Sequence, residues 1–145
     1  MAASLPLVNT GIPVLDRLLL KWQAVLNPIL KALGINGAWT AVGRPGTPAF
    51  ANGWKNVGGA APVAAFFQDW LGFVHVRGLV GGGTANTTIF TLPSEYAPAV
   101  PQTFACDAGG AYAAVGVGAN GAVTQTVGGQ ANLSLNFVLD LRSNP

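Results

Sequence analysis

Apolar residues near the start of the chain recur at alternating steps of three and four, from Ile12 to Leu33. This spacing places them along one face of a helix and is typical of a coiled-coil seam. The seam predicted to join copies consists of Ile12, Leu15, Leu19, Trp22, Leu26, Ile29 and Leu33. Leu18, Val25 and Ala32 flank it. A wide stripe that holds a tryptophan favours three or more strands over two, so we expect a homotrimer.

The ends of this helix carry recognisable signals. Pro13 suits a first helical turn, where its missing N–H is not needed, and Gly34 is a good stop. Pro28 removes an N–H and clashes one turn back, so it predicts either a kink or a second short helix capped by Asn27. We therefore predict an extended anchor over residues 1–11 and an oligomerisation helix within 12–37. A single amphipathic helix packed on its own β-domain is the alternative.

The periodicity changes after residues 34–37. Short segments rich in β-branched and aromatic residues follow, separated by Gly, Pro and Asn clusters, as in all-β sandwiches. Residues 38–145 are thus predicted to form an antiparallel β-sandwich or jelly-roll-like head domain. The predicted strands are 39–42, 54–57, 63–68, 73–80, 87–92, 104–106, 111–117, 122–126 and 133–141.

Two hairpins and two alternating strands support this prediction. One hairpin runs through residues 69–72, and the other through Asn120-Gly121, a dipeptide suited to the positive φ angles of a tight turn. Along 73–79 the even-numbered residues form one face and the odd-numbered residues the other. Along 133–139 the leucines share a face with Phe137, while Ser134 and Asn136 point to water or to a partner subunit.

The composition changes this picture by indicating assembly. Half of the 145 residues are hydrophobic and only 8% are charged, against roughly 25% in ordinary domains. Since a small monomer needs charge to cover its surface, we expect other copies or a larger assembly to cover part of it.

The few charges are unevenly distributed. Residues 1–37 hold three basic residues and one acidic residue, whereas 38–145 hold four of each. Nucleic-acid binding is not expected, because the sequence has no stripe of basic residues of the kind that contacts a phosphate backbone. Membrane insertion is not expected either, because charges interrupt the apolar stretch 12–33 and residues 1–11 lack the basic start of a signal peptide.

The reactive side chains are too few for catalysis. Cys106 is the single cysteine and His75 the single histidine, which excludes an internal disulfide and a zinc site. Cys106 is interpreted as a small buried hydrophobe, His75 as structural or interfacial, and Asp69 as a turn residue. Arg77 is interpreted as structural, with Asp69, Glu95 or a neighbouring subunit as its partner. Because no pair of carboxylates or nucleophile–base arrangement is evident, we expect no catalytic residue, no metal and no cofactor.

A recurring order of short sequence words covers the β-region. They are Phe50, Asn52-Gly53-Trp54, Asn56-Val57-Gly58-Gly59, Pro62, Phe67-Gln68-Asp69, 72–80, Ile89-Phe90-Thr91-Leu92-Pro93, Tyr96-Ala97-Pro98, Asn120-Gly121 and Leu133-Ser134-Leu135-Asn136-Phe137. This pattern, over about two-thirds of the chain, resembles the C-terminal β-domain of bacteriophage minor tail proteins and tail-fibre or receptor-binding proteins. The pattern of that family usually has basic residues where this chain has Gln68 and Ala97, and a glycine in place of Glu95.

The resemblance implies a trimeric head or tip domain that contacts the host surface, commonly a saccharide. Sugar sites combine an aromatic face with polar side chains. The candidates here are Trp70, Asp107, Tyr112, Asn120 and Gln125, the last four expected at the distal end. Trp39 and Trp54 are instead expected in the core or between subunits.

The chain is therefore expected to be a trimeric virion fibre or tail-tip protein, anchored to other virion proteins through its N-terminus. A capsid-decorating spike or another purely structural virion protein is the alternative. A bacterial lectin would call for a secretion signal, which the sequence does not show.

Overall fold

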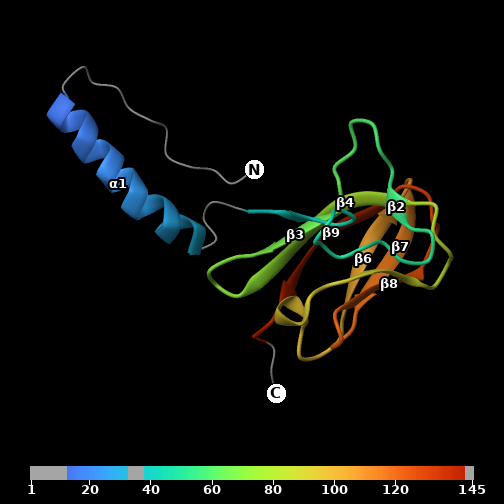
Figure 1. Ribbon diagram of the computed structural model, residues 1–145. Coiled ribbons are helices and arrows are strands. Elements are labelled where there is room, and N and C mark those ends of the chain that lie inside the picture. The colour runs from blue at the N-terminus through green and yellow to red at the C-terminus, as the bar shows by residue number, and fades with distance from the viewer. Residues whose placement is uncertain (1–12, 33–37, 143–145) are drawn as a thin grey trace.

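The computed structural model describes residues 13–32 and 38–142, which form one helix and one β-domain (Figure 1). Helix α1 spans Pro13–Ala32 and begins at the predicted proline. It passes through Pro28 in one piece, so no second helix begins at Asn27. Its many leucines and long polar side chains are good helix formers. Ile12 and Leu33, the two ends of the predicted seam, and the proposed anchor 1–11 lie outside the described residues.

Nine strands follow within residues 38–142, each within one of the nine predicted segments or extending it by at most two residues at either end. They are β1 Thr40–Ala41, β2 Lys55–Asn56, β3 Ala65–Gln68, β4 Phe73–Gly81, β5 Thr88–Thr91, β6 Gln102–Ala108, β7 Ala111–Val117, β8 Ala122–Val127 and β9 Leu133–Asp140. A short 3-10 helix, η1 Ser94–Tyr96, was not predicted. The mainly β prediction is confirmed.

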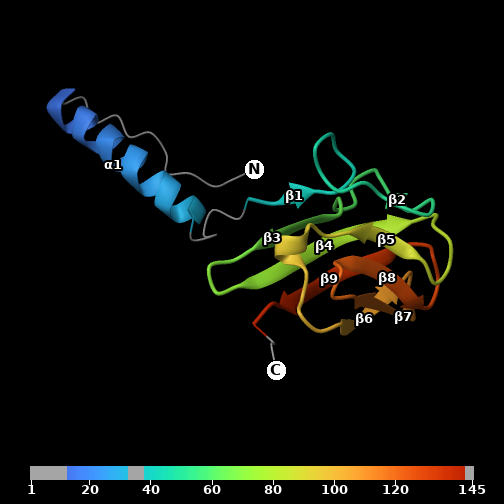
Figure 2. The same cartoon turned by 60° about the horizontal axis from the view of Figure 1, so that its bottom comes forward.

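The strands form one antiparallel sheet rather than two separate ones. Their order is β1-β3-β4-β9-β6-β7-β8-β5, with β2 paired to β4. The sheet curls so that its two halves face each other like a half-barrel (Figure 2). The halves join where β6 pairs with β9 at Ala108 and Leu133, and a bridge between Phe50 and Phe90 adds a further link. The expected sandwich is therefore a continuous sheet in this chain.

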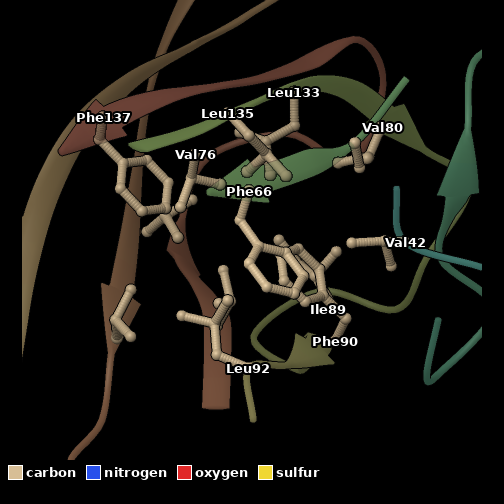
Figure 3. Close-up of a cluster of buried hydrophobic side chains, with 14 of the residues drawn as sticks. Val42, Phe66, Val76, Val80, Ile89, Phe90, Leu92, Leu133, Leu135 and Phe137 are labelled. Carbon is tan, nitrogen blue, oxygen red and sulfur yellow. The ribbon is translucent and has the colours of Figure 1, made fainter. Parts of the chain in front are cut away.

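The inner faces of the two halves enclose the hydrophobic core (Figure 3). The predicted alternation is confirmed in β4, where the even-numbered residues are buried, and in β9, where the odd-numbered ones are. The largest fully buried apolar side chains are Phe66, Phe90, Ile89, Leu92, Leu133, Leu135 and Leu139. Each such side chain contributes about 1.5–3 kcal/mol through burial. No residue of α1 belongs to this core, so the β-domain completes its own interior.

Trp54 was expected in the core or between subunits, and it lies in the core. It is 3% exposed, and its indole Nε1–H donates to the Thr87 hydroxyl at 3.1 Å. Gly83 lies directly against the ring, since a Cβ built there would meet it at 2.1 Å.

Helix α1 stands apart from the sheet in both views (Figures 1 and 2). Its apolar side chains are accordingly uncovered: Trp22 is 55% exposed, Ile29 48% and Leu26 37%. The structure therefore differs from the alternative in which the helix packs on its own β-domain.

Candidate functional site

The β3–β4 hairpin presents two large apolar side chains at its tip. Trp70 is 62% exposed and Leu71 47%. Asp69 fixes the turn, because its Oδ1 accepts hydrogen bonds from the N–H groups of Leu71 and Phe73, both at 3.0 Å. Gly72 closes the turn with a φ of 90°. The tip is thus a braced platform, and the turn role predicted for Asp69 is confirmed.

Asp69 also binds the one histidine. Its Oδ2 lies 2.8 Å from His75 Nε2. Partial burial raises the pKa of Asp69, but the hydrogen bonds from His75 and from the Phe73 and Leu71 N–H groups outweigh burial and hold that pKa below its ordinary value. This partner of His75 was not predicted from the sequence. The register of the hairpin could have supplied one, because Phe67 pairs with His75, which makes Asp69 a diagonal neighbour on the same face.

A line of side chains crosses the outside of β3, β4 and β9, which we call the outer ridge: Trp39, Phe67, His75 and Val138. Phe67 pairs with His75, His75 pairs with Val138, and Trp39 precedes Thr40, which pairs with Phe66. The Phe67 and His75 rings stack with centroids 4.7 Å apart, and Trp39 meets Phe67 edge-on at 4.5 Å. The registers and ring contacts together make one continuous feature across the sheet.

Arg77 covers one end of the outer ridge. Its Cζ lies 4.1 Å from the centroid of the Trp39 ring, a cation–π contact. Asp69, one of the partners predicted for Arg77, pairs with His75 instead. This follows from the strand geometry, since Arg77 lies two residues further from the hairpin, about 6.6 Å along β4.

The β6–β7 hairpin carries two of the predicted ligand residues. Asp107 and Tyr112 are paired across the strands, and Tyr112 is 66% exposed. The Asp107 carboxylate accepts hydrogen bonds from the Gly110 N–H at 3.0 and 3.2 Å, so it braces its own turn. Tyr112 is therefore the exposed aromatic group of this hairpin.

The side chains of Asn120 and Gln125 form hydrogen bonds within the β-domain. Asn120 Oδ1 accepts from the Ala122 N–H at 3.1 Å within the predicted turn. Gln125 is fully buried: its Oε1 accepts from the Asn86 N–H at 2.8 Å, and its Nε2 donates to the Gly128 carbonyl at 2.6 Å. This placement removes Gln125 from the ligand candidates, because a surface ligand does not reach it.

The remaining candidates lie at two opposite ends of the sheet. Phe73 pairs with Asp140 and Val80 with Leu133, and Leu133 also pairs with Ala108. Trp70 therefore lies at one end of β4, and the pair Asp107–Tyr112 lies beyond the other, about 30 Å away for a nine-residue strand. The turn at 118–121 lies at the Trp70 end, because Val117 pairs with Gln102 and the Gln102 side chain bonds to Asp140. The predicted residues thus do not form one site.

The chain enters the β-domain near the Trp70 end. Trp39, the second described residue after α1, lies alongside Phe67. Phe67 is two residues before Asp69, which forms the turn beside Trp70. The Asp107–Tyr112 pair is consequently the candidate remote from the point where the α1 connection arrives. This corrects the expected placement of Asn120, which belongs to the near end with Trp70.

Other chemistry is sparse in the described part of the chain. Residues 13–32 and 38–142 contain no group of three or more His, Cys, Asp or Glu side chains placed to hold a metal. Cys106 is half-buried against the core, and burial raises the pKa of its thiol. Over the same residues, no helix has the length and apolarity needed to cross a membrane.

Comparison with known protein families, curated proteins and solved structures found no match to this chain.

Proposed function

We propose that the chain is a homotrimeric bacteriophage virion protein, a fibre or tail-tip component, whose α1 helices form a short coiled coil and whose β-domains adsorb to the host surface. The observation that carries the proposal is the uncovered apolar face of α1 beside a β-domain whose core is complete. A helix with such a face needs a partner, and other copies of the same helix provide a matching surface.

The geometry of α1 supports the seam. At 100° per residue, one arc of the described helix holds Val14, Leu15, Leu18, Leu19, Trp22, Val25, Leu26, Ile29, Leu30 and Ala32. The rest of the circumference holds the charged and polar residues, together with Leu20, Ala24 and the two prolines. The exposed members of the arc are 37–78% exposed in the single chain, so association would bury a large apolar area.

Leu20 provides a matched control for the role of this face. Leu26 lies on the seam and is 37% exposed, while Leu20 lies on the opposite side and is 45% exposed. Completing the burial of Leu26 is worth about 1.5 kcal/mol per copy, or about 4.5 kcal/mol per trimer, equivalent to about a thousandfold in the association constant. We expect Leu26→Lys to dissociate the trimer in sedimentation velocity and Leu20→Lys to leave it intact. Equal behaviour of the two variants would contradict the seam.

The adsorption role is proposed from the resemblance and from the remote position of Asp107–Tyr112. An exposed aromatic ring beside a carboxylate suits weak contact with saccharide, and three copies per trimer multiply that affinity. The test is binding of the full-length trimer to host cells and to isolated wall polysaccharide. Tyr112→Ala should weaken binding, whereas Trp70→Ala, an aromatic loss at the opposite end, should not. A trimer that binds neither preparation would refute adsorption.

A purely structural role, such as capsid decoration, is the second candidate. It is favoured by the use of Asp107 and Asn120 within their own turns, which leaves few polar groups for a ligand. Immunogold labelling of virions separates the two roles: label at the tail tip supports adsorption, and label over the capsid supports decoration.

A further inference from the structure

We propose that the outer ridge is a second contact surface between copies, buried against the β-domain of a neighbouring chain. The inference rests on the proposed trimer and adds which face of the β-domain turns inward. The outer ridge lies outside the core described above and is only partly covered, with Val138 44% exposed and the His75 side chain 34% exposed.

The composition of this face is that of a protein interface. Trp39, Phe67 and Arg77 belong to the residue types enriched in the centres of interfaces and among their energetic hot spots. The rings are already held by their mutual contacts, edge-on between Trp39 and Phe67 at 4.5 Å and stacked between Phe67 and His75 at 4.7 Å. A prearranged surface loses little side-chain freedom when a partner covers it.

The ionisable side chains on and beside the outer ridge already have contacts within their own chain. His75 pairs with Asp69, and the Arg77 guanidinium lies on the Trp39 ring. Covering this face with a second β-domain therefore buries the Asp69 carboxylate together with its hydrogen-bond donors. Arg77 contacts a ring and not an anion, so its guanidinium belongs at the edge of the contact, because an uncompensated charge of either sign is costly to bury. The β-domain as a whole holds four basic and four acidic residues, so copies do not repel through net charge.

The connection to α1 identifies a second copy as the occupant. Trp39, at one end of the outer ridge, is seven residues beyond Ala32, the last residue of α1. Seven residues span at most about 25 Å. Bundled helices would hold the Trp39 ends of three outer ridges within that reach of the helix ends, and a short tether gives effective concentrations of about millimolar. A weak contact is then populated without strong intrinsic affinity.

The test is the rate of maleimide labelling of a cysteine placed on the outer ridge. Val138→Cys is an outward-facing change on β9, and Val127→Cys is its control, because Val127 is a similarly exposed valine at the end of β8, 48% against 44%. Each is made in the full chain and also with Leu26→Lys, which separates the copies. The wild-type chain gives the background from Cys106.

We expect Val138→Cys to react about tenfold or more slowly in the trimer than in the Leu26→Lys background, since a contact worth 1.4 kcal/mol is open one tenth of the time. Val127→Cys should react equally in both. A trimeric mass with equal rates at Val138 overturns the inference alone and leaves the outer ridge to a different protein. A native mass of one chain overturns the proposed trimer, and the inference with it.

Discussion

Replacing Gln125 by glutamate tests whether this side chain belongs to the interior or to a binding surface. The change keeps size and shape. One glutamate oxygen still accepts the hydrogen bond from the Asn86 N–H, but the other faces the Gly128 carbonyl, to which the native amide donates at 2.6 Å. That contact is favourable only while the carboxyl is protonated.

The structure sets the size and direction of the effect. A fully buried carboxyl can have its pKa raised by about 3–5 units, and each unit is worth 1.36 kcal/mol. The folded variant then holds a proton that its unfolded chain has released, so stability falls as pH rises from about 4.3, the ordinary glutamate pKa, to the raised value. A shift of about 3 units costs about 4 kcal/mol by pH 8 and almost nothing at pH 4.

Urea unfolding at both pH values measures this difference, with the fluorescence of buried Trp54 as a signal. Gln68→Glu is the control, because Gln68 is exposed on β3 and the charge change is identical. Equal stability of the two variants at pH 8 would refute the reasoning and return Gln125 to the solvated surface.

Two further predictions concern residues of β4, Gly78 on its inner face and His75 on its outer face. Gly78→Ala should lower the free energy of unfolding in urea by more than about 3 kcal/mol, because its Cβ would lie 2.4 Å from the Ala64 Cα. Gly58→Ala, at a position with open space and a φ of 90°, should lower it by only about 1–2 kcal/mol. Similar losses in the two variants would contradict this packing. His75→Ala should raise the pKa of Asp69, measured by a carboxyl NMR titration. The ionised Asp69 stabilises the fold at neutral pH, and on acidification the variant should lose this stability at a higher pH than the wild type. An unchanged Asp69 pKa would show that the 2.8 Å contact has no electrostatic effect.

Local patterns predicted the elements well. The alternation in 133–139 identified the buried face of β9, and Asn120-Gly121 identified a turn, because each signal depends on neighbouring residues alone. The bounds of β6 were less accurate, since its polar first residues, Gln102 and Thr103, give no hydrophobic signal.

Features that depend on distant partners were not predicted. A glutamine suggests a surface position, yet Gln125 is buried because Asn86 and Gly128 satisfy its amide. The outer ridge requires the register of β1 on β3, which the sequence does not encode locally. The joining of the two halves into one sheet rests on one residue pair between β6 and β9 and on the bridge between Phe50 and Phe90, and each pairs residues far apart in the sequence.

The most direct test of the central claim is the native mass of the full-length protein by sedimentation equilibrium. If α1 joins three copies, the mass is about 44 kDa, three times the 14.7 kDa of one chain. It should fall to the mass of one chain in Leu26→Lys and stay trimeric in Leu20→Lys. A wild-type mass of 14.7 kDa at micromolar concentration would contradict the account, because the uncovered apolar face of α1 would then remain without a partner copy.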